Sequence, residues 1–282
     1  MDGAGALYTD HVTDGDLRLL SAALDIPAAE LRRDQDSFPA VLADPRVFEA
    51  ILGERAVARA VPLQVSPFLL FAVVVHRAQR ELASMSHVPE RAGLRQKVPV
   101  FDTPQLADFL ATPERRLFLI ELLASFTRIA SGRYPVRTRH GWRWRRFNEL
   151  DPVRLAGLLE AVGEAERPGI YRRLGDVSLF LTGVFPDYAG DRALSPVDAA
   201  RLVRIAGVSA RDEHERMIAT PAIELFELLG ARWYRTAWQL APVRTDRLAT
   251  IVEVAERFRS ARRVLNHLAD HYLFPVINPR DT

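Results

Sequence analysis

Arginine and tryptophan residues are interleaved in one short stretch of the chain, between Tyr134 and Phe147. An arginine side chain makes paired hydrogen bonds to a phosphate group, and an aromatic ring stacks on a nucleobase. These residue types on one element therefore predict a binding surface for an anionic partner. The residues that we assign to this polyanion-binding surface are Arg137, Arg139, Trp142, Arg143, Trp144, Arg145 and Arg146.

The positive charge of the chain is concentrated around the same stretch. Residues 122–148 contain seven arginines and no Asp or Glu, whereas the whole chain of 282 residues has a net charge of +2. The remaining residues therefore carry −5, since +2 less +7 is −5. Arginine supplies every basic residue except Lys97, which is typical of a GC-rich genome. The clustering of the arginines is thus better evidence for an anionic partner than their number.

Residues 134–147 are expected to form a β-hairpin that holds these side chains. Tyr, Val, Thr, Trp and Phe favour strands, and His140-Gly141 suits a two-residue loop. With that loop, Arg139 pairs with Trp142 and Arg137 pairs with Trp144, and paired residues share a face. One face then holds Arg137, Arg139, Trp142, Trp144 and Arg146, and the other holds Tyr134, Val136, Thr138, Arg143, Arg145 and Phe147.

A different interpretation of the hairpin needs no ligand. The tryptophans would then pack the hairpin against neighbouring helices, and the arginines would be solvated or paired with acidic residues elsewhere in the chain.

Because isolated buried charges are costly, we expect the hairpin to project from the helices with Arg143 and Arg145 largely exposed.

The rest of the chain predicts an all-α fold, a multi-helix orthogonal bundle in which this Arg/Trp-rich hairpin is the one small β element. Many predicted helices begin with Ser, Thr or Asp followed by Pro, which suits the cap and the first helical position. Apolar residues at helical spacing follow these starts. The predicted helices are 14–24, 27–33, 45–52, 66–84, 104–110, 113–131, 152–163, 168–184, 196–206, 221–240 and 246–273.

The longest predicted connector is 85–102, which contains Pro89, Gly93 and Pro99. We therefore expect an N-terminal helical unit over 1–84 and a main helical bundle over 103–282, with the hairpin at 134–147. The alternative is a single domain in which 85–102 is an internal loop.

A second aromatic–basic group lies on the predicted helix 221–240. It consists of Arg232, Trp233, Tyr234, Arg235 and Trp238. Tyr234 and Trp238 are four residues apart, so they lie on one helix face. We interpret these aromatic residues as anchors in the core or an interface, and a ligand pocket is the alternative.

Two histidines lie four residues apart on the last predicted helix. The spacing of His267 and His271 can place two imidazoles on one metal ion, but the sequence identifies no third ligand. We therefore predict no metal site and interpret both histidines as a polar helix edge. Since the common nucleophile, phosphate-loop and dinucleotide motifs are missing as well, no catalytic residue and no cofactor are assigned.

Together these features favour a non-enzymatic helical protein that contacts nucleic acid or another polyanion through the hairpin. The first alternative is a helical scaffold or oligomer component that uses the hairpin as a protein–protein contact, with an acidic protein or a second copy of the chain as the partner. The second is an enzyme or cofactor binder with a pocket between helices. The longest apolar run is too short to span a membrane, and the chain has no cysteine and no apparent signal peptide. We therefore expect no membrane partner and a cytoplasmic location.

Overall fold

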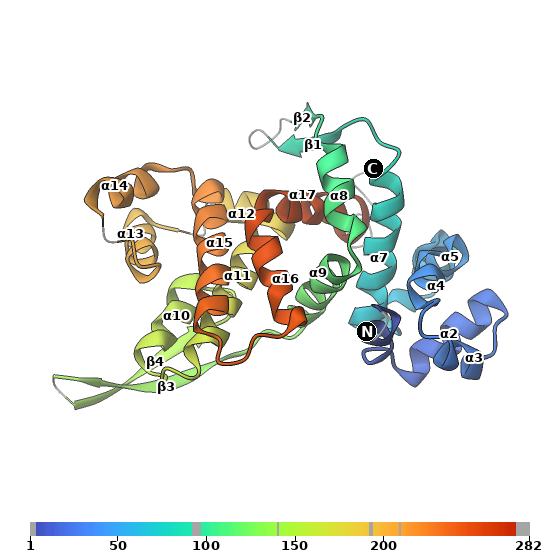
Figure 1. Ribbon diagram of the computed structural model, residues 1–282, viewed down its shortest axis with the longest axis horizontal. Coiled ribbons are helices and arrows are strands. Elements are labelled where there is room, and N and C mark those ends of the chain that lie inside the picture. The colour runs from blue at the N-terminus through green and yellow to red at the C-terminus, as the bar shows by residue number, and fades with distance from the viewer. Residues whose placement is uncertain (1–3, 92–96, 140, 192–193, 209, 275–282) are drawn as a thin grey trace. The chain divides into compact units, whose positions relative to one another are not determined.

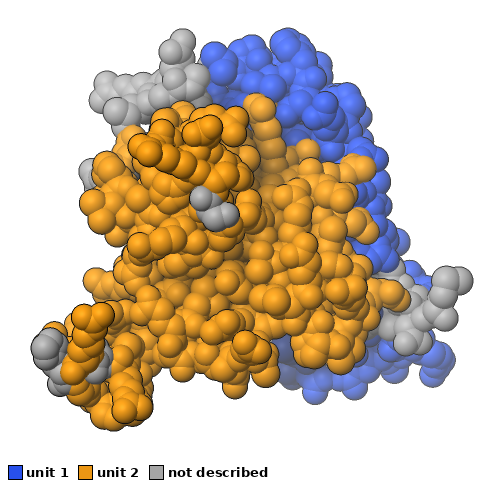
Figure 2. Space-filling view, turned by 60° about the vertical axis from the view of Figure 1, so that its left-hand side comes forward, with its two compact units in different colours: residues 1–127, 267–282 blue, residues 128–266 orange. Residues whose placement is uncertain are grey.

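The computed structural model describes residues 4–91, 97–139, 141–191, 194–208 and 210–274. The fold is mostly α-helical, as the sequence predicts, with two small antiparallel strand pairs in the described ranges (Figure 1). The chain forms two compact units, which are coloured in Figure 2. Unit 1 contains residues 1–127 and 267–282, and unit 2 contains residues 128–266.

These units do not coincide with the predicted segments 1–84 and 103–282. The predicted connector 85–102 lies inside unit 1, where the helix before it packs against the second helix after it. A proline-rich connector marks a break in helical periodicity, but it does not reveal which helices pack together. The second boundary, between residues 266 and 267, falls within a helix.

Unit 1 consists of short helices around α7 and α9, with one strand pair between α7 and α8. Its elements are α1 (Ala4–Thr9), α2 (Asp14–Leu24), α3 (Ala28–Arg33), α4 (Phe38–Ala43), α5 (Pro45–Leu52), α6 (Glu54–Ala58), the 3-10 helix η1 (Val61–Leu63), α7 (Pro67–Leu82), β1 (Val88–Arg91), β2 (Lys97–Val100), α8 (Thr103–Ala111), α9 (Pro113–Ser125) and the π-helix η3 (Ala269–Leu273).

Unit 2 begins with the predicted hairpin and continues with helices. Its elements are β3 (Ser131–Thr138), β4 (Gly141–Asn148), α10 (Pro152–Ala156), the 3-10 helix η2 (Gly157–Glu160), α11 (Arg167–Val184), α12 (Pro186–Asp191), α13 (Pro196–Ile205), α14 (Arg211–Ala219), α15 (Ala222–Leu240), α16 (Asp246–Glu256) and α17 (Phe258–Leu268), whose last two residues belong to unit 1.

The predicted helix starts are confirmed where the caps can be followed atom by atom. The Ser66 side chain accepts a hydrogen bond from the Leu69 amide at 3.1 Å, and Pro67 is the first residue of α7. The Asp44 carboxylate likewise accepts from the Arg46 amide at 2.8 Å. The cap residue satisfies an amide that has no partner within the helix, and proline has no amide to lose at that position.

The strand pair of unit 1 corrects the prediction that the Arg/Trp hairpin is the one β element. β1 and β2 lie within the predicted connector, and Pro89 pairs with Pro99 across them. Proline cannot donate to a strand ladder, so prolines in this segment favour a connector over a strand. A two-stranded sheet tolerates it, because each strand has an edge without a partner.

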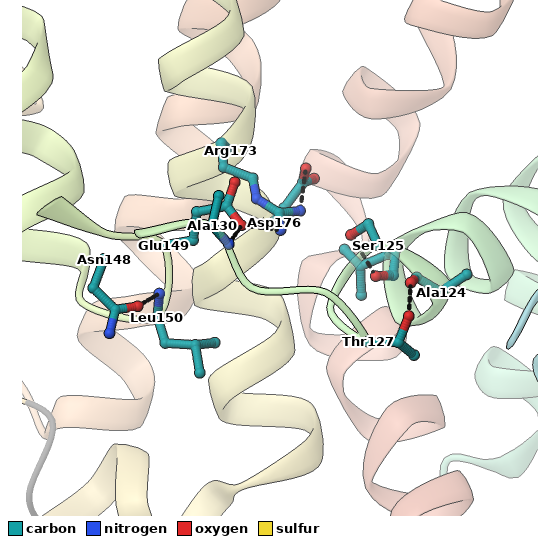
Figure 3. Close-up of polar contacts among 10 residues, drawn as sticks. Ala124, Ser125, Thr127, Ala130, Asn148, Glu149, Leu150, Arg173 and Asp176 are labelled. Atoms are coloured by element: carbon teal, nitrogen blue, oxygen red, sulfur yellow. Dashed lines mark hydrogen bonds and ion pairs between the residues drawn. The ribbon is translucent and has the colours of Figure 1, made fainter. Parts of the chain in front are cut away.

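Two of the predicted helices end or break before their predicted C-termini. The helix expected over 113–131 ends at Ser125, and the helix expected over 246–273 breaks at Arg257, where φ is −116° and ψ is 30°. At the first end, the hydroxyls of Ser125 and Thr127 donate to the carbonyl oxygens of Leu122 and Ala124, each at 2.7 Å (Figure 3). Such local bonds give the chain an alternative to further helix.

The centre of unit 2 is the contact between α11 and α15, which run side by side (Figure 1). Gly175 of α11 makes this approach close, since a Cβ atom there would lie 2.5 Å from the ring of Tyr234. Gly183, further along the same helix, allows Leu265 of α17 to pack equally close, since a Cβ atom there would lie 2.5 Å from the Leu265 side chain. Both Tyr234 and Leu265 are fully buried, so these helices form the core that carries the hairpin.

No helix in the described part of the chain is long and apolar enough to cross a membrane.

Candidate functional site

The hairpin forms where the sequence predicts it, but its register differs from the expected one. β3 and β4 pair so that Arg137 lies opposite Trp142, Pro135 opposite Trp144, and Thr138 opposite Gly141. The expected pairs, Arg139 with Trp142 and Arg137 with Trp144, are therefore wrong. Arg139 lies beyond the last residue of β3, and the predicted loop residue His140 lies outside the described residues.

The observed register differs from the expected one by two residues, so side chains expected on the same face of the hairpin still share a face. Side chains alternate along a strand with a period of two, and a shift of two returns each residue to its own face. Arg139 leaves the sheet, and Arg133 joins through its pairing with Arg146. We define the Arg/Trp face as Arg133, Arg137, Trp142, Trp144 and Arg146, and the packed face as Tyr134, Val136, Arg143, Arg145 and Phe147.

The Arg/Trp face is open to solvent. Trp142 and Trp144 are each 70% exposed, and the three arginines of this face are exposed as well. The hairpin extends past α10, away from the other helices of unit 2 (Figure 1). The interpretation in which the tryptophans seat the hairpin on the helices is therefore wrong. The expected exposure of Arg143 and Arg145 is confirmed.

Among the residues that the structure describes, four of the five arginines of the predicted polyanion-binding surface have no acidic partner, and Arg145 is the exception. No ion pair or hydrogen bond in those ranges involves the side chains of Arg137, Arg139, Arg143 or Arg146. The net negative charge of the rest of the chain does not neutralise the hairpin locally. Large exposed aromatic rings beside uncompensated charge mark an interaction surface.

The packed face attaches the hairpin to α10 and η2. Tyr134 and Phe147 are half-buried, and their ring centroids lie 6.5 Å apart. The Tyr134 hydroxyl lies against Gly157, where a Cβ atom would be only 2.7 Å from it. Arg145 forms an ion pair with Glu160 at 2.8 Å, so this arginine of the predicted surface already has a partner.

A shallow groove of about 300 Å³ lies beside the root of the hairpin. Four arginines line it, and one of them, Arg201, lies 3.7 Å from Glu160, the same carboxylate that pairs with Arg145. Arg154 pairs with Asp151 at 3.0 Å. Two carboxylates thus contact three of the four groove arginines, and the fourth, Arg146, belongs to the Arg/Trp face and has no such contact in the described ranges. The residues that line it are Tyr134, Arg145, Arg146, Val153, Arg154, Gly157 and Arg201.

A polar network fixes the root of the hairpin to the core of unit 2 (Figure 3). Glu149 directly follows β4; its carboxylate accepts from the Ala130 amide at 2.9 Å and from Arg173 at 3.1 Å. Arg173 also lies 3.8 Å from Asp176, which accepts a hydrogen bond from the Tyr234 hydroxyl at 2.9 Å. This chain of contacts runs from the backbone before β3 to the centre of α15.

The inner end of this network is buried, and the burial changes its acid–base properties. Desolvation raises the pKa of Asp176, while the nearby Arg172 and Arg173 oppose that rise. Burial also raises the pKa of Tyr234 well above its ordinary value, and the charge of Asp176 adds to this effect. The Tyr234 hydroxyl therefore keeps its proton and donates a hydrogen bond to Asp176. The sequence did not reveal this network, because its members lie on three elements far apart in the chain.

The second aromatic–basic group is part of the core of unit 2. Trp233 and Tyr234 are fully buried, which confirms their interpretation as core anchors. Arg232 donates to the Ala206 and Gly207 carbonyl oxygens at 2.6 and 3.2 Å, at the end of α13. A groove of about 430 Å³ lies beside this group, but neither Trp233 nor Tyr234 lines it.

The histidines of the last predicted helix lie in unit 1, and one of them is not at an edge. His267 is fully buried, and its Nε2 atom lies 3.7 Å from a carboxylate oxygen of Glu81. Burial is the main cause that lowers the pKa of His267 to about 4, and the neighbouring His271 adds to it. Tyr272 also donates a hydrogen bond to Glu81. Among the described residues, no group of three or more His, Cys, Asp or Glu side chains is arranged to hold a metal ion.

No protein-family model, curated protein or solved structure matches this chain. We therefore infer a function from the geometry of the hairpin.

Proposed function

We propose that the protein binds nucleic acid through the Arg/Trp face of its β3–β4 hairpin. The observation that carries the proposal is the pairing of two 70% exposed tryptophans with three exposed arginines on one face of a projecting hairpin. Arginine gives charge-assisted hydrogen bonds to phosphate groups, and indole rings stack on bases. A nucleic acid is the partner that offers phosphate groups and flat aromatic bases in one molecule.

The packed face supports the same assignment, because its side chains make contacts that those of the Arg/Trp face lack. Arg145 is paired with Glu160, and the Tyr134 hydroxyl lies against Gly157, so that face has a structural role. The Arg/Trp face has no comparable contact in the described ranges. A protein partner with an acidic surface would neutralise the arginines and cover the indole rings, but a nucleic acid repeats phosphate groups and stacking faces along one chain.

The proposal is tested by the salt dependence of binding to a mixed-sequence oligonucleotide. For the wild type we expect binding at low salt and a steep loss of affinity between about 50 and 200 mM salt. Replacing Arg137 and Arg146 with Ala should weaken binding and flatten the slope of log affinity against log salt. The slope should change by roughly 0.7–0.9 for each phosphate group that the variant no longer neutralises.

A matched control removes the same charge elsewhere in unit 2. Arg204 on α13 and Arg211 on α14 are exposed, and their replacement with Ala changes the net charge by the same amount. This control should leave the salt slope unchanged. No wild-type binding at low salt, or equal slopes for the two double variants, would contradict the proposal and favour a protein-contact role for the hairpin.

A further inference from the structure

The two exposed tryptophans have a spacing that matters for the kind of nucleic acid bound. Trp142 and Trp144 are two residues apart on β4, so they lie on one face with Cα atoms about 7 Å apart. Arg137 lies opposite Trp142 near the tip, and Arg133 lies opposite Arg146 near the root. The face therefore presents two aromatic rings in a row, with positive charge at both ends.

Indole rings stack on the faces of bases, and these faces are covered in a duplex. A base pair inside double-stranded DNA has neighbours above and below, so only its edges are open in the grooves. A two-stranded ribbon that enters the major groove reads those edges with polar side chains. The centre of the Arg/Trp face has indole and Pro135 in those places, which offer little to base edges.

The nearest amide side chain on this face is already engaged. Asn148, at the root of β4, accepts a hydrogen bond from the Leu150 amide through its side-chain oxygen at 2.9 Å (Figure 3). It closes the turn after the hairpin. The face is thus built for stacking and for charge, without side-chain amides that distinguish one base from another.

From this arrangement we infer that the ligand is a single-stranded nucleic acid, bound with little sequence preference. Two bases stack on Trp142 and Trp144, and the phosphates before and after them contact Arg137 at one end and Arg133 and Arg146 at the other. The inference rests on the proposed function and adds to it the class of nucleic acid. Stacking tolerates any sequence, because every base has a π face.

The test compares two labelled ligands of equal length, a mixed-sequence single strand of about 16 nucleotides and its blunt duplex. Fluorescence anisotropy at one fixed low salt concentration should show the single strand bound at least about 10-fold more tightly by the wild type. Trp142→Leu with Trp144→Leu keeps apolar bulk but removes the large aromatic faces. This variant should bind the single strand at least about 30-fold more weakly, and its affinity for the duplex should change little.

A conservative variant separates stacking from general damage. Trp142→Phe with Trp144→Phe retains two aromatic rings and should keep most of the preference for the single strand. Circular dichroism checks that both variants keep the helical content of the wild type; because the two side chains are exposed, we expect no change.

The outcomes distinguish the inference from the proposed function. Duplex bound as tightly as the single strand, or a preference that survives in the double leucine variant, would overturn the inference and leave the proposed function standing. Failure of the wild type to bind either ligand at low salt would overturn both.

Discussion

The hairpin and helix α15 carry similar side chains and use them in opposite ways. Each has tryptophan next to arginine, yet Trp142 and Trp144 are 70% exposed, whereas Trp233 is fully buried. Arg232 donates to backbone carbonyl oxygens, while Arg137 has no such partner in the described ranges. Aromatic and basic residues that are adjacent in sequence therefore do not identify a binding surface by themselves.

The element that carries the residues decides between the two uses. α15 lies against α11 and α16, so its apolar face is covered on more than one side. The hairpin is a two-stranded sheet that packs on α10 through β4, and no described helix covers the tryptophans of its Arg/Trp face. A single hairpin has two faces and only one of them is supported. The exposed face is available for a ligand.

The largest expected difference between the two regions is in stability. Trp233→Ala should lower the free energy of unfolding by about 3–5 kcal/mol, because it leaves a large cavity in the core. Trp142→Ala should change it by about 0.5 kcal/mol or less, since the ring is mostly in water. Chemical denaturation of both variants measures the difference. Similar losses for the two variants would mean that the hairpin tryptophan is part of a packed structure.

A smaller effect is expected for the hydroxyl of Tyr234. Tyr234→Phe removes the hydrogen bond to the buried Asp176 carboxyl and should lower the free energy of unfolding by about 1–3 kcal/mol. The change retains the ring against Gly175, so it tests the polar contact separately from the packing. Trp144 of the hairpin serves as the comparison, because it belongs to no such network. Trp144→Val should leave the free energy of unfolding within about 0.5 kcal/mol of the wild type.

The same pair predicts a direction for the effect of pH. The folded-state pKa of Asp176 is raised above its ordinary value of 3.8, so the folded state holds this proton more tightly than the unfolded state. The contribution of Asp176 to stability is therefore lost as pH rises above 3.8 through the folded-state pKa. Tyr234→Phe should deepen this loss, and Asp176→Asn should remove it. A Tyr234→Phe penalty that shrinks with rising pH would contradict this account of the pair.

The smallest expected effect concerns the ion pair of the packed face. Arg145→Ala and Glu160→Gln should each change the free energy of unfolding by about 0–1 kcal/mol, because both side chains are about half exposed. A double-mutant cycle measures the coupling between them.

Since Arg145 lies on the packed face, its loss should weaken nucleic-acid binding less than the loss of Arg137. The reverse order would show that the two faces are assigned the wrong roles.

The sequence predicts the helix starts of this protein better than the helix ends. Capping residues before Pro45 and Pro67 are local signals, and the structure bears them out. The break at Arg257 has no comparable signal, because neither proline nor glycine lies beside it. It separates α16, which packs on α15, from α17, whose Leu265 fills the space beside Gly183. No single segment of the sequence predicts tertiary packing of this kind.

The hairpin was predictable as an element and as two faces, but not in its exact pairing. The alternation of Trp142, Arg143 and Trp144 fixes which side chains of β4 share a face, and a register shift of two residues keeps the same β3 residues beside them. The sequence predicts Gly141 as a loop residue, but Gly141, with a positive φ of 100°, is the first residue of β4. The exposure of the tryptophans and the link from Glu149 to Asp176 depend on contacts with distant helices, and local sequence does not contain them.

We expect the exposed tryptophans of the hairpin, and not the two tryptophans of α15, to contact the ligand. The chain has four tryptophans, so two double variants divide them: Trp233→Phe with Trp238→Phe leaves only the hairpin pair, and Trp142→Phe with Trp144→Phe leaves only the α15 pair. On titration with a single-stranded oligonucleotide, the emission of the first variant should be quenched, because bases stack on its indole rings. The second should bind with little change in emission. Quenching confined to the α15 pair, or binding without any response of the hairpin pair, would contradict the assignment of the Arg/Trp face.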